Sequence, residues 1–204
     1  MELHTVEARW FEDGPCPAVV AEWFHSAQWV SEPEARTDEY LKLPGRDDVG
    51  VKRRAGIQLD LKLRTGTPTG VVLPEGLDGP VEAWTKWSFP LGSDVSLPGE
   101  GSWIPVEKLR WSRGYAATGR GVVAVPPGAT SSSGCAIELV ELAIGRRRAW
   151  GFGFEAFGEG NLDDVLAATG QAVVADTPLG DITFTARGTH SYPAWLQLEG
   201  TAAG

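Results

Sequence analysis

The sequence has few of the residues that build disulfide or zinc sites. Its 204 residues include two cysteines, Cys16 and Cys135, which lack CxxC spacing, and this argues against a disulfide framework or a zinc ribbon. The three histidines, His4, His25 and His190, are scattered along the chain, so neither a histidine-rich metal site nor a Ser-His-Asp triad is indicated. We expect both cysteines to be small core residues.

Long hydrophobic runs are also lacking. No stretch approaches the roughly 20 apolar residues that cross a bilayer, and residues 1–7 do not have the basic-then-apolar layout of a signal peptide. We therefore expect a soluble cytoplasmic protein with no membrane partner.

Positive charge is in the minority. The chain has 18 Lys and Arg against 27 Asp and Glu, a formal net charge of −9, which disfavours general binding to nucleic acid or to an anionic membrane. The charge is also uneven, because residues 46–113 hold ten basic and nine acidic side chains whereas residues 1–45 hold three and nine. Basic groups are thus concentrated in the middle third of the chain.

Residues typical of strands and turns are plentiful. The 26 Gly, 14 Pro and 9 Trp favour a β protein over a helix bundle. We predict one domain over residues 1–204, mainly β (α+β), built as an antiparallel barrel or tunnel of about eight strands with a few flanking helices. Helices are expected from Pro17 to Ser26 and from Asn161 to Gly170. The expected strands cover residues 2–12, 36–43, 49–54, 57–64, 81–89, 106–113, 135–144 and 148–157.

Ionisable residues occupy alternate positions in one expected strand after another. Asp60, Lys62 and Arg64, for example, alternate with three leucines. A solvated outer sheet face gives such alternation by default, but the outer face of a protein with this net charge should be acidic, and these faces are mostly basic. The alternative is a barrel with a basic lumen that takes a polyanion. The basic residues assigned to that lumen are Arg9, Lys52, Arg54, Lys62, Arg64, Lys86, Lys108 and Arg110.

The layout of these strands resembles the CYTH-like or triphosphate tunnel family, which includes thiamine triphosphatases, class IV adenylate cyclases and inorganic tripolyphosphatases. Residues 5–9 (TVEAR) are similar to the family's opening E-x-E-x-K, with Thr5 at the first glutamate. Residues 51–54 (VKRR), 59–64 (LDLKLR) and 106–110 (VEKLR) resemble its basic strands. Residues 153–158 (GFEAFG) resemble its final strand, with Phe157 where the family has the second glutamate of E-x-E.

The resemblance implies a carboxylate site for Mg²⁺ or Mn²⁺ and a small phosphorylated ligand: a triphosphate, a polyphosphate or a nucleotide. The implied metal ligands are Glu7, Glu141 and Glu155, with no catalytic residue assigned. Glu138 and Glu141 lie on opposite faces of one expected strand, and the sequence does not choose which of them enters the lumen.

Three functions remain open at this point. The first is a metal-dependent hydrolase that cleaves a triphosphate or organic phosphate inside the tunnel. The second is a non-catalytic binding barrel with a degenerate metal site, which Thr5 and Phe157 favour. The third is a barrel whose tryptophans line an apolar pocket or an interface.

Overall fold

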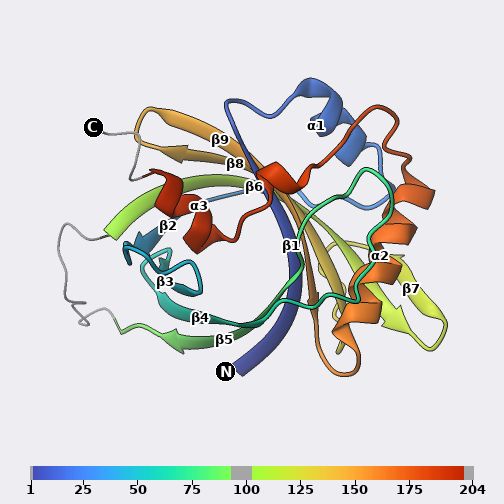
Figure 1. Ribbon diagram of the computed structural model, residues 1–204, viewed down its shortest axis with the longest axis horizontal. Coiled ribbons are helices and arrows are strands. Elements are labelled where there is room, and N and C mark those ends of the chain that lie inside the picture. Colours follow the sequence, from blue (N-terminus) through green and yellow to red (C-terminus); the bar gives the residue numbers. More distant parts are fainter. Residues whose placement is uncertain (1, 93–102, 200–204) are drawn as a thin grey trace.

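A closed antiparallel barrel forms the centre of the molecule. The structure is a computed structural model that describes residues 2–92 and 103–199 (Figure 1). Strands follow the order β2-β3-β4-β5-β1-β9-β8-β6, and pairing of β2 with β6 closes this eight-stranded ring. Strand β7 pairs with β6 outside the ring. The strands are β1 (Glu2–Asp13), β2 (Glu34–Leu41), β3 (Val49–Arg54), β4 (Gln58–Gly66), β5 (Glu82–Pro90), β6 (Trp103–Thr118), β7 (Gly121–Val125), β8 (Gly134–Ile144) and β9 (Arg147–Phe157).

Helical segments flank the barrel. They are α1 (Ala18–His25), α2 (Leu162–Asp176), the 3₁₀ turn η1 (Ala186–Gly188) and α3 (Tyr192–Glu199). The predicted mainly β class and antiparallel barrel are therefore confirmed. Strand β7 and helix α3 were not predicted, and β6 continues beyond the predicted end of its strand at residue 113 because it also pairs with β7.

The predicted end of the last long helix at Gly170 is wrong. Asn161 does cap α2, since its side chain accepts a hydrogen bond from the Asp163 backbone, but the helix continues to Asp176. A Cβ atom at position 170 would lie 2.9 Å from Cδ of Pro74. This glycine therefore allows close approach of a neighbouring loop and does not end the helix.

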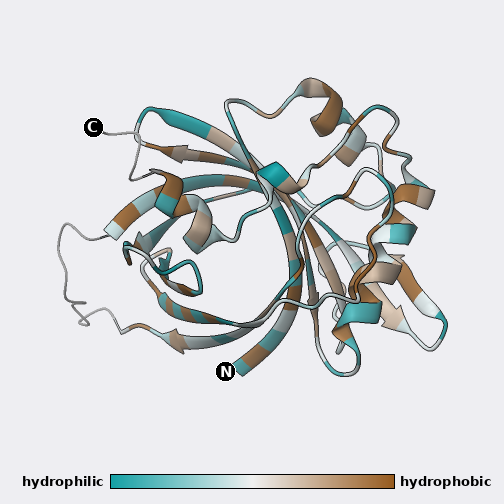
Figure 2. Cartoon of the chain, viewed as in Figure 1, coloured by the Kyte–Doolittle hydropathy of each residue, from teal (hydrophilic) through white to brown (hydrophobic). Residues whose placement is uncertain are grey.

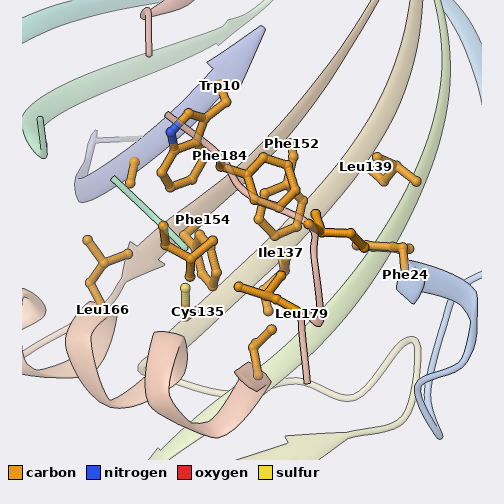
Figure 3. Close-up of a cluster of buried hydrophobic side chains, with 14 of the residues drawn as sticks. Trp10, Phe24, Cys135, Ile137, Leu139, Phe152, Phe154, Leu166, Leu179 and Phe184 are labelled. Atoms are coloured by element: carbon orange, nitrogen blue, oxygen red, sulfur yellow. The ribbon is translucent and has the colours of Figure 1, made fainter. Parts of the chain in front are cut away.

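The outer face of β1, β8 and β9 carries the larger hydrophobic core. Val6, Ala8 and Trp10 point outward from β1, and all three are buried. Figure 3 shows aromatic side chains of this core between the barrel strands and the flanking helices. Phe152 stacks on Phe184 with ring centroids 4.5 Å apart. Each such fully buried side chain contributes roughly 1.5–3 kcal/mol, so this core anchors α1 and α2 to one side of the barrel.

The inner face of the barrel is apolar at one end. There, Phe11, Tyr40 and Val106 pack against Trp195 of α3, and Phe11 stacks on Trp195 with centroids 4.9 Å apart. In Figure 1, α3 lies across the opening of the barrel. Away from this end, hydrophilic and hydrophobic residues alternate along strands of the barrel (Figure 2). Polar side chains therefore fill the middle of the barrel.

The prediction that both cysteines are core residues is confirmed for Cys135 and only in part for Cys16. Cys135 is buried and Cys16 is half-buried, and both are free thiols. Burial raises the pKa of Cys135 to about 12, as expected of a core residue. None of the helices in the described part of the chain has the length and apolar character of a membrane span.

Candidate functional site: a basic cavity inside the barrel

The barrel encloses a cavity of about 240 Å³. Its lining contains eight basic and four acidic side chains, a formal excess of four positive charges in a protein of net charge −9. Most of the alternating basic residues therefore line the lumen. We call this space the lumen cavity; its charged lining residues are Glu7, Arg9, Arg36, Lys52, Arg54, Asp60, Lys62, Lys86, Lys108, Arg110, Glu138 and Glu155.

Two lysines face each other on neighbouring strands of the cavity wall. Lys62 of β4 and Lys86 of β5 are direct cross-strand partners, an arrangement in which like charges repel. Lys62 donates a hydrogen bond to Glu7, and its ammonium lies 5.3 Å from the centre of the Trp84 ring. A bound anion between the two lysines would relieve the remaining repulsion.

Lys52 and Lys108 share one buried carboxylate. Their Nζ atoms lie 3.8 Å and 3.2 Å from Oδ2 of Asp38. Burial and the charge of Arg54 lower the pKa of Lys52 to about 8, despite the attraction of Asp38 and Asp60. Burial and the charge of Lys52 likewise lower the pKa of Lys108 well below its usual value. Asp38 and Asp60 are also contacted by Arg36 and Arg54, so two carboxylates serve four cations and an added anion would favour the charged forms of the lysines.

A glycine lets the Arg9 side chain cross from β1 to β8. Arg9 is opposite Gly153 of β9, which is in turn opposite Glu138 of β8. A Cβ atom at position 153 would lie 3.1 Å from Cγ and 3.3 Å from Cζ of Arg9. Over this bare backbone, Nη1 of Arg9 donates to Oε1 of Glu138 at 2.7 Å, and Arg110 donates to Oε2 at 3.0 Å.

The charge of Glu138 is held by its basic neighbours. Burial alone would raise the pKa of this carboxyl, but the charges of Arg9, Lys108 and Arg110 outweigh burial and hold the pKa well below its usual range. Glu138 is therefore ionised at neutral pH and fixes two guanidinium groups at the cavity wall.

Two donors at the lumen cavity have no hydrogen-bond partner among the described residues. They are the Tyr192 hydroxyl and Nε of Arg54, and both residues line the cavity. Two carboxylate oxygens, Asp38 Oδ1 and Asp60 Oδ2, also lack one, but each lies within 3.6 Å of a basic group. Unpaired buried donors are disfavoured in folded proteins, so oxygen atoms of a ligand are their natural partners.

Most of the basic residues predicted from sequence meet in this cavity. Seven of the eight line it, and the exception is Arg64. Its strand position is two residues beyond Lys62, past the cavity, where its guanidinium lies 2.7 Å from Glu82 and 3.1 Å from Asp47. Assignment of Arg64 to the lumen lining is thus corrected.

The open choice between Glu138 and Glu141 is decided by strand position. Glu138 lines the lumen cavity, whereas Glu141 is exposed on the other face of β8. Glu141, chosen as a metal ligand from the sequence, therefore does not reach the lumen. Glu7 and Glu155 do line it, as direct partners across β1 and β9.

Two functional residues of the lining, Arg36 and Tyr192, were not predicted. Arg36 lies in an expected strand on the same face as Tyr40, so the alternation that identified the other bases was available for it. Tyr192 comes from α3, far along the sequence, and no local pattern indicates that this helix enters the barrel opening.

The residues that replace the missing carboxylates lie at one place. Thr5 and Phe157, where the family has glutamates, are direct cross-strand partners on β1 and β9. The Thr5 hydroxyl donates to Glu7 at 2.6 Å. A hydroxyl engaged in this bond and a phenyl ring give Mg²⁺ or Mn²⁺ none of the free carboxylate oxygen that such ions prefer.

The remaining carboxylates of the cavity do not fit a divalent cation either. Glu7 accepts from Lys62, and Glu138 accepts from two arginines. Glu155 lies 3.9 Å from Arg9. Over residues 2–92 and 103–199, no three His, Cys, Asp or Glu side chains are grouped so as to hold a metal ion. Basic side chains occupy the positions from which these carboxylates would bind one.

Comparisons with known proteins give matches in structure only. No family model and no curated protein matches the chain. Similar solved structures include the PH1819 protein from Pyrococcus horikoshii OT3, with a TM-score of 0.46, 14% identity, and coverage of 96% of this chain and 99% of that one. The mimivirus capping enzyme triphosphatase has a TM-score of 0.44 and 12% identity, covering 86% and 90%.

A third match is the S. pombe Pct1 RNA triphosphatase. Its TM-score is 0.35 at 11% identity, and the alignment covers 98% of this chain and 83% of that one. Two of these three structures are triphosphatases.

Proposed function

We propose that the lumen cavity binds a small, multiply charged phosphate compound of the triphosphate or organic phosphate class. The observation that carries this proposal is the convergence of eight Lys and Arg side chains on one enclosed space. Phosphate oxygens are suitable partners for these Lys and Arg side chains. Hydrogen bonds between charged groups are about twice as strong as hydrogen bonds between neutral groups.

The shape and surroundings of the cavity favour a compact ligand over a polymer. A space of about 240 Å³ admits a short phosphate chain but not a nucleic acid duplex. The net charge of −9 also opposes long-range attraction of polyanions. Selectivity is therefore supplied by contacts inside the lumen, including the two unpaired donors of Arg54 and Tyr192.

Hydrolysis is a second candidate function, favoured by the exposure and weak pairing of one carboxylate, Glu155. Glu155 has a side chain 31% exposed and its contact with Arg9 is long, at 3.9 Å, so it is the lining carboxylate best placed to accept a proton from water. The surrounding cations would stabilise charge on a departing phosphate. We assign binding as the main function, because each of the other glutamates of the lining is bonded to a cation.

Two neighbouring residues of β3 supply the test. Lys52 lines the cavity, whereas Arg53 points outward and donates to Glu39 at 2.6 Å. Calorimetric titration with tripolyphosphate should show binding by the wild type, a loss of about tenfold or more in Lys52→Gln, and no change beyond about twofold in Arg53→Gln. Absence of binding, or equal loss in both variants, would overturn the proposal.

The same samples test the second candidate. Orthophosphate is measured after incubation of the wild type and of Glu155→Gln with tripolyphosphate. Release by the wild type that stops in Glu155→Gln would establish hydrolysis. Binding without release is the result expected of a binding protein.

A further inference from the structure

The strongest feature of the lumen that phosphate binding alone does not explain is the position of Arg9. Its side chain is only 9% exposed and lies among three glutamates, which belong to its own strand β1, to β9 and to β8. Nη1 is 2.7 Å from Glu138 and Nη2 is 3.9 Å from Glu155. Glu7 also contributes to the electrostatic stabilisation that, against burial, raises the pKa of Arg9 above its usual value.

The backbone is built to admit this guanidinium. Gly153 leaves the space that the Arg9 stem crosses, and Gly151, Gly153 and Glu155 alternate on the same face of β9. The Tyr192 ring covers the guanidinium from the side of α3, with Cζ of Arg9 5.2 Å from the ring centre. Arg9 is therefore held on three sides by groups of the protein.

We propose that the Arg9 guanidinium takes the place of a divalent cation among these carboxylates, so that the cavity binds its phosphate ligand free of Mg²⁺ or Mn²⁺. This inference rests on the proposed phosphate binding. The fixed guanidinium balances the negative charge of the glutamates, as a metal ion would otherwise do. It can also donate hydrogen bonds to a phosphate oxygen as well as to Glu138.

Charge also disfavours a metal-bound form of the ligand. A phosphate chain that carries Mg²⁺ has two fewer negative charges, and its metal would enter a lining with a formal excess of four positive charges. Repulsion between like charges in a partly desolvated space is strong. The metal-free polyanion is therefore the preferred ligand class.

The test combines two probes on the wild-type protein. Mn²⁺ alone is titrated into the protein while the electron paramagnetic resonance signal of the free ion is followed, and tripolyphosphate is titrated in buffer with EDTA. We expect the Mn²⁺ signal to be unaffected and tripolyphosphate to bind in EDTA. Mn²⁺ binding by the protein, or tripolyphosphate binding that requires added metal, would overturn the inference while phosphate binding itself stands. No binding of tripolyphosphate with or without metal would instead overturn the proposed function.

A variant removes the guanidinium. Arg9→Ala should weaken binding in EDTA by about tenfold or more and should gain Mn²⁺ binding, because Glu7, Glu138 and Glu155 lose their shared cation. The matched control is Arg148→Ala, an exposed arginine of β9, which should change neither. Unchanged tripolyphosphate affinity in a folded Arg9→Ala protein would contradict the role given to Arg9. The wild-type titrations decide the inference even where Arg9→Ala fails to fold.

Discussion

The guanidinium of Arg9 lies 2.7 Å from the carboxylate of Glu138, although the two residues belong to strands separated by β9. The contact exists because the residue between them is glycine. This contact holds one negative and one positive group at the cavity wall. Removing either partner of such a buried ion pair is costly, because the other charge is then left buried without it.

Removal of Glu138 should destabilise the protein and strengthen anion binding. Glu138→Gln removes the buried carboxylate that Arg9 and Arg110 share and leaves them only the more exposed Glu155 and Glu34, so the free energy of unfolding should fall by about 3 kcal/mol. The added positive charge of the cavity should tighten tripolyphosphate binding severalfold. Glu141→Gln, on the opposite face of β8, is the control and should change neither quantity beyond error. Weaker binding by Glu138→Gln would contradict this charge balance.

Loss of the Tyr192 hydroxyl should weaken tripolyphosphate binding without lowering the stability of the protein. Because that hydroxyl is buried and without a hydrogen-bond partner in the described structure, Tyr192→Phe should leave the free energy of unfolding unchanged or raise it by up to about 1 kcal/mol. Tripolyphosphate affinity should fall about three- to tenfold, since a donor to phosphate is lost. Denaturant unfolding and calorimetry measure the two effects, and unchanged affinity would show that the hydroxyl does not meet the ligand.

Binding should weaken as pH rises through the pKa of Lys52. That lysine faces Asp38 and Arg36 from β2, Arg54 from its own strand, Asp60 from β4 and Lys108 from β6; burial and the charge of Arg54 are the main causes that lower its pKa to about 8. A bound polyanion would raise the pKa again, so Lys52 should take up about half a proton when the complex forms at pH 8, and any uptake by Lys108 adds to it.

A rise in pH acts in opposite directions on the stability of the ligand-free protein and on its affinity for tripolyphosphate. Between about pH 8 and the ordinary lysine pKa, the unfolded chain binds more protons at Lys52 than the folded chain, so this lysine makes the ligand-free protein more stable as pH rises. Affinity for tripolyphosphate should instead fall from pH 7 to pH 9. Lys52→Arg is the control, because its side chain stays charged over this range while tripolyphosphate itself titrates in the same way. If the affinity of both proteins depended equally on pH, titration of Lys52 would not be the cause.

A methyl group at position 153 should displace Arg9. In Gly153→Ala the new Cβ atom would meet Arg9 Cγ at 3.1 Å and the Ala8 carbonyl oxygen at 3.2 Å. We expect a loss of roughly 1–3 kcal/mol in the free energy of unfolding and weaker tripolyphosphate binding. Gly66→Ala is the control, because its nearest neighbour would be at 3.9 Å. Equal stability of the two variants would show that Arg9 adapts without cost.

The barrel and most of its lining were predictable because strand periodicity is a local signal. Alternation of charged with apolar residues assigns a face to each side chain of a strand, and the sign of the charge favoured an internal basic face. Arg64 was misplaced because alternation gives the face of a strand but not how far along it the cavity extends.

Features that depend on distant parts of the chain could not be predicted in the same way. Glu138 and Glu141 have similar neighbours in sequence, and only the pairing of Glu138 with Gly153 places it beside Arg9. Entry of Tyr192 into the barrel opening depends on packing of α3 against Phe11 and Tyr40. Neither contact has a local sequence signal.

The most direct test of phosphate binding in the lumen is the position of the ligand in a crystal structure. Crystals of the wild-type protein grown with tripolyphosphate and EDTA should show phosphate density inside the barrel, within hydrogen-bond distance of Lys52, Lys62 and Arg110, with the Tyr192 hydroxyl donating to it. Tripolyphosphate bound only on the outer surface, for example at the basic turn of residues 146–148, with none in the lumen, would contradict the account.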